Sequence, residues 1–159
     1  MSDDFPISKP SSPPAPRSAG THVLSQLMIR SSASSAYAAC ADPDLLSQWF
    51  TTGARQDVHV GGRYSNNDGD SGEFLEVVPN QRLKFTWEQP RQAPGSRVTI
   101  EFIPQGSNDV NVRLTHSNIE TEEDLAGLED GWRWALDSLK SFLERGIGIR
   151  YAEWTSRRR

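Results

Sequence analysis

Cysteine is nearly absent from this sequence of 159 residues, and Cys40 is the single one. No internal disulfide can form, so a packed core has to hold the fold, and we expect a reducing, cytoplasmic setting. Cys40 lies in an alanine-rich segment without a cationic neighbour. This surrounding indicates a small buried side chain and not a reactive thiol.

Long apolar runs are also missing. No stretch approaches the roughly 20 apolar residues of a membrane-spanning helix, and no secretory signal is expected at the N-terminus. The 17 basic and 21 acidic residues leave a net charge of −4, whereas nucleic-acid binders usually present a basic face. We therefore expect no nucleic-acid partner and no stable membrane insertion.

Motifs for metal, phosphate or covalent chemistry do not occur either. The three histidines, His22, His59 and His116, are scattered without the spacing of metal ligands. No glycine-rich loop follows a strand, and no nucleophile elbow is found. The sequence thus predicts no metal, no cofactor and no motif-defined catalytic residue.

Composition divides the chain into three parts. Residues 1–20 hold five prolines among many serines, and such a segment buries too little apolar surface to offset its ordering entropy, so we expect a disordered arm. Residues 21–146 are expected to form one folded domain. Residues 147–159 are read as a basic C-terminal tail, solvated in preference to binding an anionic surface.

The first part of the domain predicts one strand followed by two short helices. Residues 22–30 have strand character. Ser31 and Ser32 can cap a short helix, and Asp42 with Pro43 can start another after a kink.

The middle of the domain predicts an antiparallel meander. Residues 82–88, 96–104 and 109–116 alternate apolar and polar side chains, which is typical of strands with one buried face. Turn residues separate these segments, so consecutive strands pair as hairpins. We expect a sheet of about six strands.

The last predicted element is one long helix over residues 121–145. Thr121 can cap it, three acidic residues follow, and Gly146 suits its C-terminal end. Gly131 lies within it at a cost of about 1 kcal/mol relative to alanine, for which we expect a close approach to a neighbouring element. The apolar stripe of this helix consists of Leu125, Leu128, Trp132, Leu136, Leu139 and Leu143.

These elements predict an α+β fold of the helix-grip type, with a curved antiparallel sheet wrapped around the C-terminal helix. A sheet bent over a single helix buries both apolar faces at once. A round helix fills a concave sheet incompletely, so we expect an apolar cavity between the two.

Large apolar side chains on both sides of that gap are the candidate ligand-binding residues. Among them Trp49, Tyr64, Trp87 and Trp132 have a polar group that can orient a ligand. The full predicted set is Trp49, Phe50, Tyr64, Phe74, Phe85, Trp87, Phe102, Leu114, His116, Trp132 and Leu136.

His116 has two interpretations. As a polar group at the cavity mouth it can donate or accept a proton near neutral pH. The alternative, which we prefer, is a structural histidine bonded to a loop carbonyl. An enzyme acting on an apolar substrate would need His116 together with Tyr64 or Arg63.

Short motifs in a fixed order over residues 21–142 resemble the activator of heat-shock protein 90 ATPase homologue-like domains of the START-like (SRPBCC) superfamily. The motifs are Ala41-Asp42-Pro43, Trp49-Phe50, Val60-Gly61-Gly62-Arg63-Tyr64, Gly72-Glu73, Pro79, Arg82-Leu83, Phe85-Thr86-Trp87, Ser96 to Phe102, Leu114-Thr115-His116 and Gly131-Trp132 with Leu136 and Leu139.

The resemblance implies the helix-grip fold and several functions. The first is binding of a hydrophobic small molecule or lipid between sheet and helix. One alternative is a co-chaperone-like protein-interaction domain, with a chaperone as partner and a link to the stress response. Another alternative is a cyclase or hydrolase acting on an apolar substrate. Either a monomer or a homodimer is compatible with it.

Overall fold

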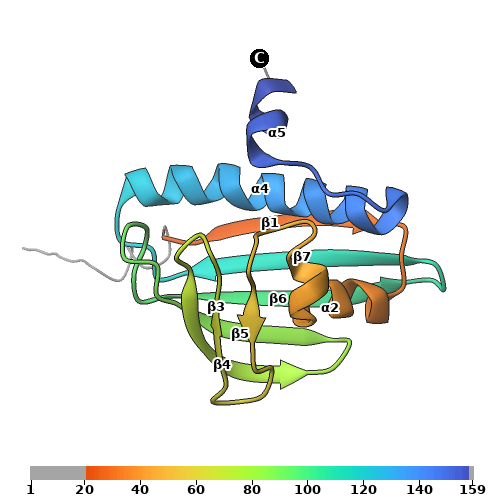
Figure 1. The fold of residues 1–159 in the computed structure, drawn as a ribbon, viewed down its shortest axis with the longest axis horizontal. Coiled ribbons are helices and arrows are strands. Elements are labelled where there is room, and N and C mark those ends of the chain that lie inside the picture. The colour runs from red at the N-terminus through yellow and green to blue at the C-terminus, as the bar shows by residue number, and fades with distance from the viewer. Residues whose placement is uncertain (1–20, 158–159) are drawn as a thin grey trace, which may run out of the picture.

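Residues 21–157 are described by the computed structural model. The predicted disordered arm, residues 1–20, lies outside the described residues, as do Arg158 and Arg159. The α+β helix-grip prediction is confirmed: one curved antiparallel sheet lies against a long helix near the C-terminus (Figure 1).

The sheet has seven strands in the described part of the chain, in the order β1-β7-β6-β5-β4-β3-β2. All neighbours pair antiparallel. The two-residue β2 accounts for the difference from the expected six or so. The strands are β1 (Val23–Ile29), β2 (Arg55–Gln56), β3 (Arg63–Ser65), β4 (Ser71–Val78), β5 (Arg82–Trp87), β6 (Ser96–Gln105) and β7 (Asp109–Ser117).

Four helices are described, and the predicted caps start three of them. Ser32 accepts from the Ser35 amide, Asp42 from the amides of Asp44 and Leu45, and Thr121 from the Asp124 amide. The helices are α2 (Ala33–Ala41), α3 (Pro43–Leu46), α4 (Glu122–Arg145) and α5 (Tyr151–Arg157). The short α5 was not predicted.

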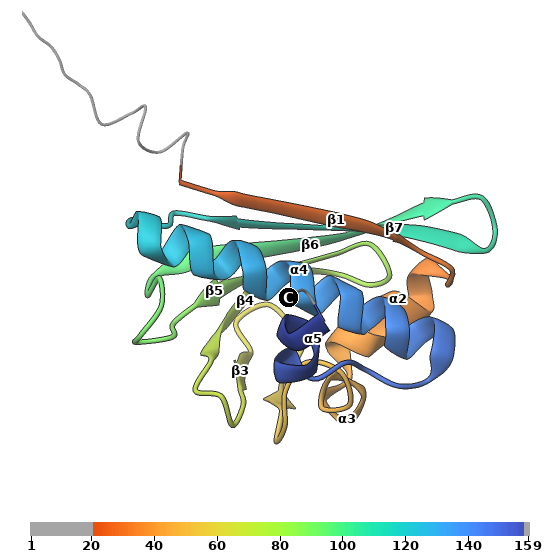
Figure 2. The same ribbon diagram turned by 90° about the horizontal axis from the view of Figure 1, so that it is seen from above.

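The core lies between the sheet and α4, which crosses one face of the sheet (Figure 2). The period-two pattern holds throughout β7 and in β6 from Ser96 to Phe102, where the inward side chains are all buried. Leu128, Trp132, Leu136 and Leu139 of α4 are buried against this face, and each large apolar side chain removed from water contributes roughly 1.5–3 kcal/mol. The predicted apolar stripe therefore faces the sheet.

A close approach of β4 to its neighbours helps to position the site. A Cβ atom on Gly72 would collide with the Thr86 carbonyl oxygen of β5 and with the Tyr64 ring of β3. A shift in register between Phe74 and Glu76 follows in the same strand, and such irregularities increase local bending. The curved end of the sheet thus depends on a glycine at position 72.

Candidate functional site

A small apolar cavity lies between the sheet and α4. Its volume is about 60 Å³, which is room for a few water molecules and not for a lipid chain. Cys40 and Ala135 also line this inner cavity. Nine of the predicted ligand-binding residues contribute to its wall: Trp49, Phe50, Tyr64, Phe74, Phe85, Trp87, Leu114, Trp132 and Leu136.

Phe102 and His116, the other two predicted site residues, lie elsewhere in the core. Phe102 packs edge-on against Tyr37 of α2, with the ring centroids 5.7 Å apart. His116 is fully buried, with an exposed fraction of 0%. Neither side chain lines the inner cavity, so His116 does not stand at its mouth.

Outside the inner cavity lies a much larger outer cleft of about 770 Å³. Its walls are the segment 47–52, residues of the turn before β4, one face of α4 and the segment 147–153. This volume falls within the range of small-molecule sites. The residues that line both hollows are Trp49, Phe50, Asp70, Trp87 and Trp132.

Phe50 separates the two hollows. Its ring is nearly parallel to that of Trp132, with an interplanar angle of 2° and centroids 5.8 Å apart. It also stacks on Trp134 at a centroid distance of 5.8 Å. Phe50 is half-buried and lines both the outer cleft and the inner cavity.

A chain of hydrogen bonds fixes the indole of Trp132. Its Nε1–H is donor-only and donates to Nδ1 of His116 at 2.9 Å. The remaining proton of the neutral imidazole is therefore on Nε2, which donates to Ser96 Oγ at 2.6 Å. The Ser96 hydroxyl in turn donates to the carbonyl of Ala93. Burial lowers the pKa of His116 to about 4, so the ring is neutral at pH 7.

The polar groups of Trp49, Tyr64 and Trp87 are also bonded within the protein. The indole of Trp49 donates to the Ala39 carbonyl and that of Trp87 to the Gln92 carbonyl. These bonds fix the walls of the inner cavity, and a role of the three side chains in orienting a ligand stays a prediction.

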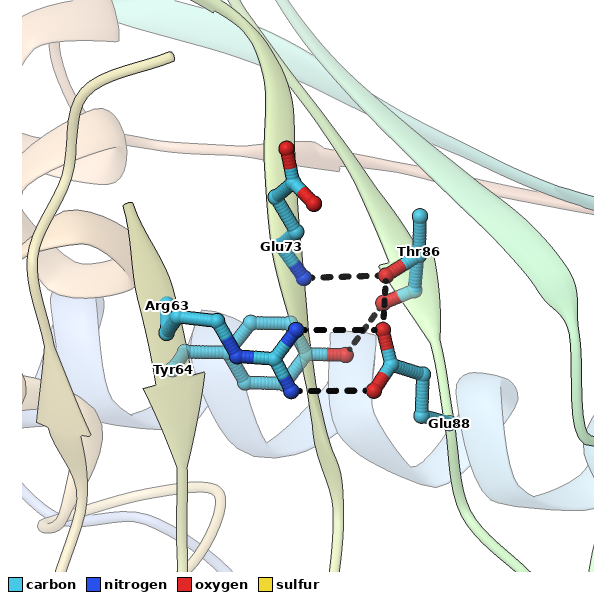
Figure 3. A network of polar contacts seen from close by, with 5 residues as sticks. All are labelled: Arg63, Tyr64, Glu73, Thr86 and Glu88. Atoms are coloured by element: carbon cyan, nitrogen blue, oxygen red, sulfur yellow. Dashed lines mark hydrogen bonds and ion pairs between the residues drawn. The ribbon is translucent and has the colours of Figure 1, made fainter. Parts of the chain in front are cut away.

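Tyr64 belongs to a polar network that joins β3, β4 and the end of β5 (Figure 3). Its hydroxyl donates to the Thr86 carbonyl at 2.7 Å, and burial raises the pKa of this phenol. Arg63 pairs with Glu88 at 2.9 Å, and this hydrogen bonding lowers the pKa of the Glu88 carboxyl. The Thr86 hydroxyl accepts from the Glu73 amide and donates to Glu88. Arg63 and Tyr64, considered above as partners of His116 in catalysis, are thus engaged in holding strands together.

Sequence reasoning missed the segment that forms one wall of the outer cleft. Residues 147–157, here named the C-terminal strap, include α5 and were expected to be a solvated tail. Ser138 and Trp154 are buried. Ser138 accepts from the Ile149 amide, and Trp154 donates to Asp137. The signal in the sequence was Trp154, a large apolar side chain in a segment after Gly146 that was expected to be solvated.

The expected reason for Gly131 is also wrong. A Cβ atom at this position would have no neighbour within 4 Å, so no close packing requires a glycine. Gly131 instead lines the outer cleft.

Within residues 21–157, none of the helices has both the length and the apolar character that a membrane span needs.

Comparisons with known proteins agree on the fold. The family model for Activator of Hsp90 ATPase homolog 1-like protein matches residues 30–144. No curated protein matches significantly. Among solved structures, CalU16 from Micromonospora echinospora is 25% identical, with 79% of this chain and 77% of that chain covered and a TM-score of 0.70.

Two further structures are similar to this chain. The Aha1 dimer from Colwellia psychrerythraea is 26% identical, covering 80% of this chain and 98% of that one, with a TM-score of 0.71. PFC0360w, an HSP90 activator from Plasmodium falciparum, is 24% identical over 71% of this chain and 88% of that one, with a TM-score of 0.65. The latter likeness is one of fold alone.

Proposed function

The chain belongs to the family of Activator of Hsp90 ATPase homolog 1-like proteins, and on this basis we propose that it binds a hydrophobic small molecule at the junction of Phe50 and Trp132. The observation that carries the proposal is that the outer cleft and the inner cavity share a wall of aromatic side chains. A ligand in the cleft can therefore place one apolar group inside the core.

The sizes of the two hollows define how such a ligand lies. The inner cavity of about 60 Å³ accepts a group of a few heavy atoms, so the rest of the molecule occupies the cleft. Transfer of apolar surface from water supplies roughly 25 cal/mol per Å². The walls are held by hydrogen bonds within the protein, so little ordering accompanies binding.

The experiment is a fluorescence titration of the protein with N-phenyl-1-naphthylamine, a neutral apolar probe. We expect saturable binding of one probe per chain. Ala135→Val fills part of the inner cavity and should weaken binding at least threefold. Ala126→Val, on the exposed side of the same helix, is the matched control and should leave the affinity unchanged. Absence of saturable binding to the wild-type chain would refute the proposal.

A second candidate is a protein-interaction role with a chaperone as partner. It is supported by the family and by the likeness to the Aha1 dimer. Leu24 and Met28 of the edge strand β1 are 54% and 47% exposed, and they lie on the same side of the strand. An ATPase assay with heat-shock protein 90 tests it. The wild type should stimulate turnover, Leu24→Lys with Met28→Lys should abolish the effect, and Gln105→Lys, at an exposed position at the end of β6, should not.

A further inference from the structure

We infer that the outer cleft, with the C-terminal strap as one wall, selects the ligand, and that its geometry points to a planar, multi-ring aromatic molecule. This inference rests on the proposed function and names the ligand class and the elements that discriminate.

Aromatic rings form a continuous cluster along the cleft. Phe50 stacks on both Trp132 and Trp134. Tyr151 of the strap stands edge-on to Trp134, with an interplanar angle of 87° and the centroids 5.6 Å apart. Tyr151 is 46% exposed although it lines the cleft. Flat ligand rings gain from offset-stacked and edge-to-face contacts with such side chains.

Helix α4 forms the floor of the cleft, and two glycines leave this bare floor without projecting side chains at their positions. Gly127 and Gly131 are one turn apart on the same face of the helix, and both line the cleft. A Cβ at Gly131 would project into open space. A glycine within a helix is unfavourable, and the structure offers no packing reason for this one. The open floor leaves space for a ring system to lie over the helix.

The depth of the site argues against a chain-like ligand. A fatty acyl tail needs a long apolar tunnel, and the inner cavity of about 60 Å³ holds only the end of one. A planar molecule instead lies with one face on the bare floor of the cleft and one edge against its aromatic side chains. Asp68 and Asp70 also line the cleft, and their carboxylates are bonded within the protein to Thr51 and Gln89.

The strap is held in place by buried hydroxyl groups of α4. Ser138 Oγ accepts from the Ile149 amide at 2.9 Å and donates to the Trp49 carbonyl at 2.7 Å. Ser141 Oγ donates to the carbonyl of Ile147. If the strap departed, these buried groups would lose partners, which is costly. The strap is therefore a fixed wall.

The strap is also fitted to the opposite wall of the cleft. A Cβ atom at Gly148 would lie 2.7 Å from the Cα of Trp49 and 2.9 Å from the Gln48 carbonyl oxygen. The strap thus touches the segment that carries Phe50. Residues 147–157 lie beyond the 30–144 match to the family, so this wall comes from outside the matched region.

Two fluorescent probes test the ligand class in the full chain. 1-Aminoanthracene has three fused rings, and cis-parinaric acid is a single unbranched chain. We expect 1-aminoanthracene to bind at least tenfold more tightly. Equal affinities, or tighter binding of cis-parinaric acid, would overturn the assignment to planar ligands.

Variants test the floor and the strap. Gly131→Leu should raise the Kd of 1-aminoanthracene at least tenfold without lowering the Tm, whereas Glu129→Leu, on an exposed position of α4, should change neither. Tyr151→Ala should raise the Kd about fivefold, and Tyr151→Phe should restore it. Tyr151 is half exposed, so its variants are expected to fold. They therefore test whether the outer cleft contributes to binding even if Gly131→Leu fails to fold.

The outcomes separate this inference from the proposed function. Should the wild-type chain bind no apolar probe, the proposed function itself fails. Should Ala135→Val weaken binding while Gly131→Leu and Tyr151→Ala do not, the inner cavity alone is the site. In that case the proposed function stands and the assignment to the outer cleft is refuted.

Discussion

The indole N–H of Trp132 donates to Nδ1 of His116 across 2.9 Å, between the helix and the last strand of the sheet. This bond requires a neutral imidazole, because a protonated ring has two donor nitrogens and no acceptor. The ring packs against Trp87 and Trp132 and bonds to Ser96, all of which are neutral. The packing of helix on sheet therefore depends on the protonation state of one buried histidine.

Acid is expected to destabilise the protein through His116. The folded-state pKa of about 4 lies below the ordinary value near 6.5, so the unfolded chain binds the proton first. The stabilisation is complete above about pH 6.5 and is lost as the pH falls to about 4, by roughly 3 kcal/mol. Urea unfolding at several pH values measures it. His116→Gln should remove most of this dependence, and an unchanged slope in that variant would contradict the assignment.

Alanine at position 131 is expected to stabilise the fold. The added methyl group meets no protein atom, and the helix gains about 1 kcal/mol. Gly146→Ala provides the contrast, because this cap has φ +84, and should destabilise by about 1 kcal/mol or more. Urea midpoints distinguish the two. A destabilised Gly131→Ala would mean that the helix is packed more closely there than the structure indicates.

Removal of the Ser138 hydroxyl is expected to loosen the strap. Ser138→Ala leaves the Trp49 carbonyl and the Ile149 amide without this partner, at a cost of about 1–3 kcal/mol. Hydrogen exchange of the Ile149 amide should accelerate. Ser141→Ala breaks a single bond, to Ile147, and should have the smaller effect. Equal and negligible effects would show that the strap is held by other contacts.

Cys40 is expected to be unreactive in the folded chain. Its exposed fraction is 7% and burial raises the pKa of the thiol to about 12, so almost no thiolate forms at pH 8. Labelling with a disulfide reagent should proceed only after denaturation in urea. Rapid labelling of the native protein would show that the inner cavity opens to solvent on that timescale.

The sequence predicted the regular elements because their patterns are local. Alternation over 109–116 placed Val110 and Leu114 on one buried face, and the stripe through Leu128 and Trp132 identified the inward side of α4. Capping chemistry at Thr121 and Gly146 located both ends of the helix. Each of these signals depends on neighbours within a few residues.

The outer cleft was not predictable in the same way, since it depends on contacts between distant segments. Ser138 is an ordinary polar residue in the sequence, and only its bonds to Trp49 and Ile149 explain its burial. Composition alone led us to predict a solvated tail at the strap. The arginines indicated an exposed segment, and this prediction disregarded Trp154, which indicated a buried one. The preferred interpretation of His116 was a bond to a loop carbonyl, and the structure shows this connection running through Ser96.

The pairing of β1 with β7 has a consequence for how the chain is made. β1 leaves the ribosome before every other strand of the sheet, yet its partner is the last strand to be synthesised. Until then β1 waits unpaired with Val23 and Ile29, which the fold buries, open to solvent, and this is a hazard for intermolecular association. Folding yield, more than the final stability, is therefore expected to respond to the speed of translation between these two strands.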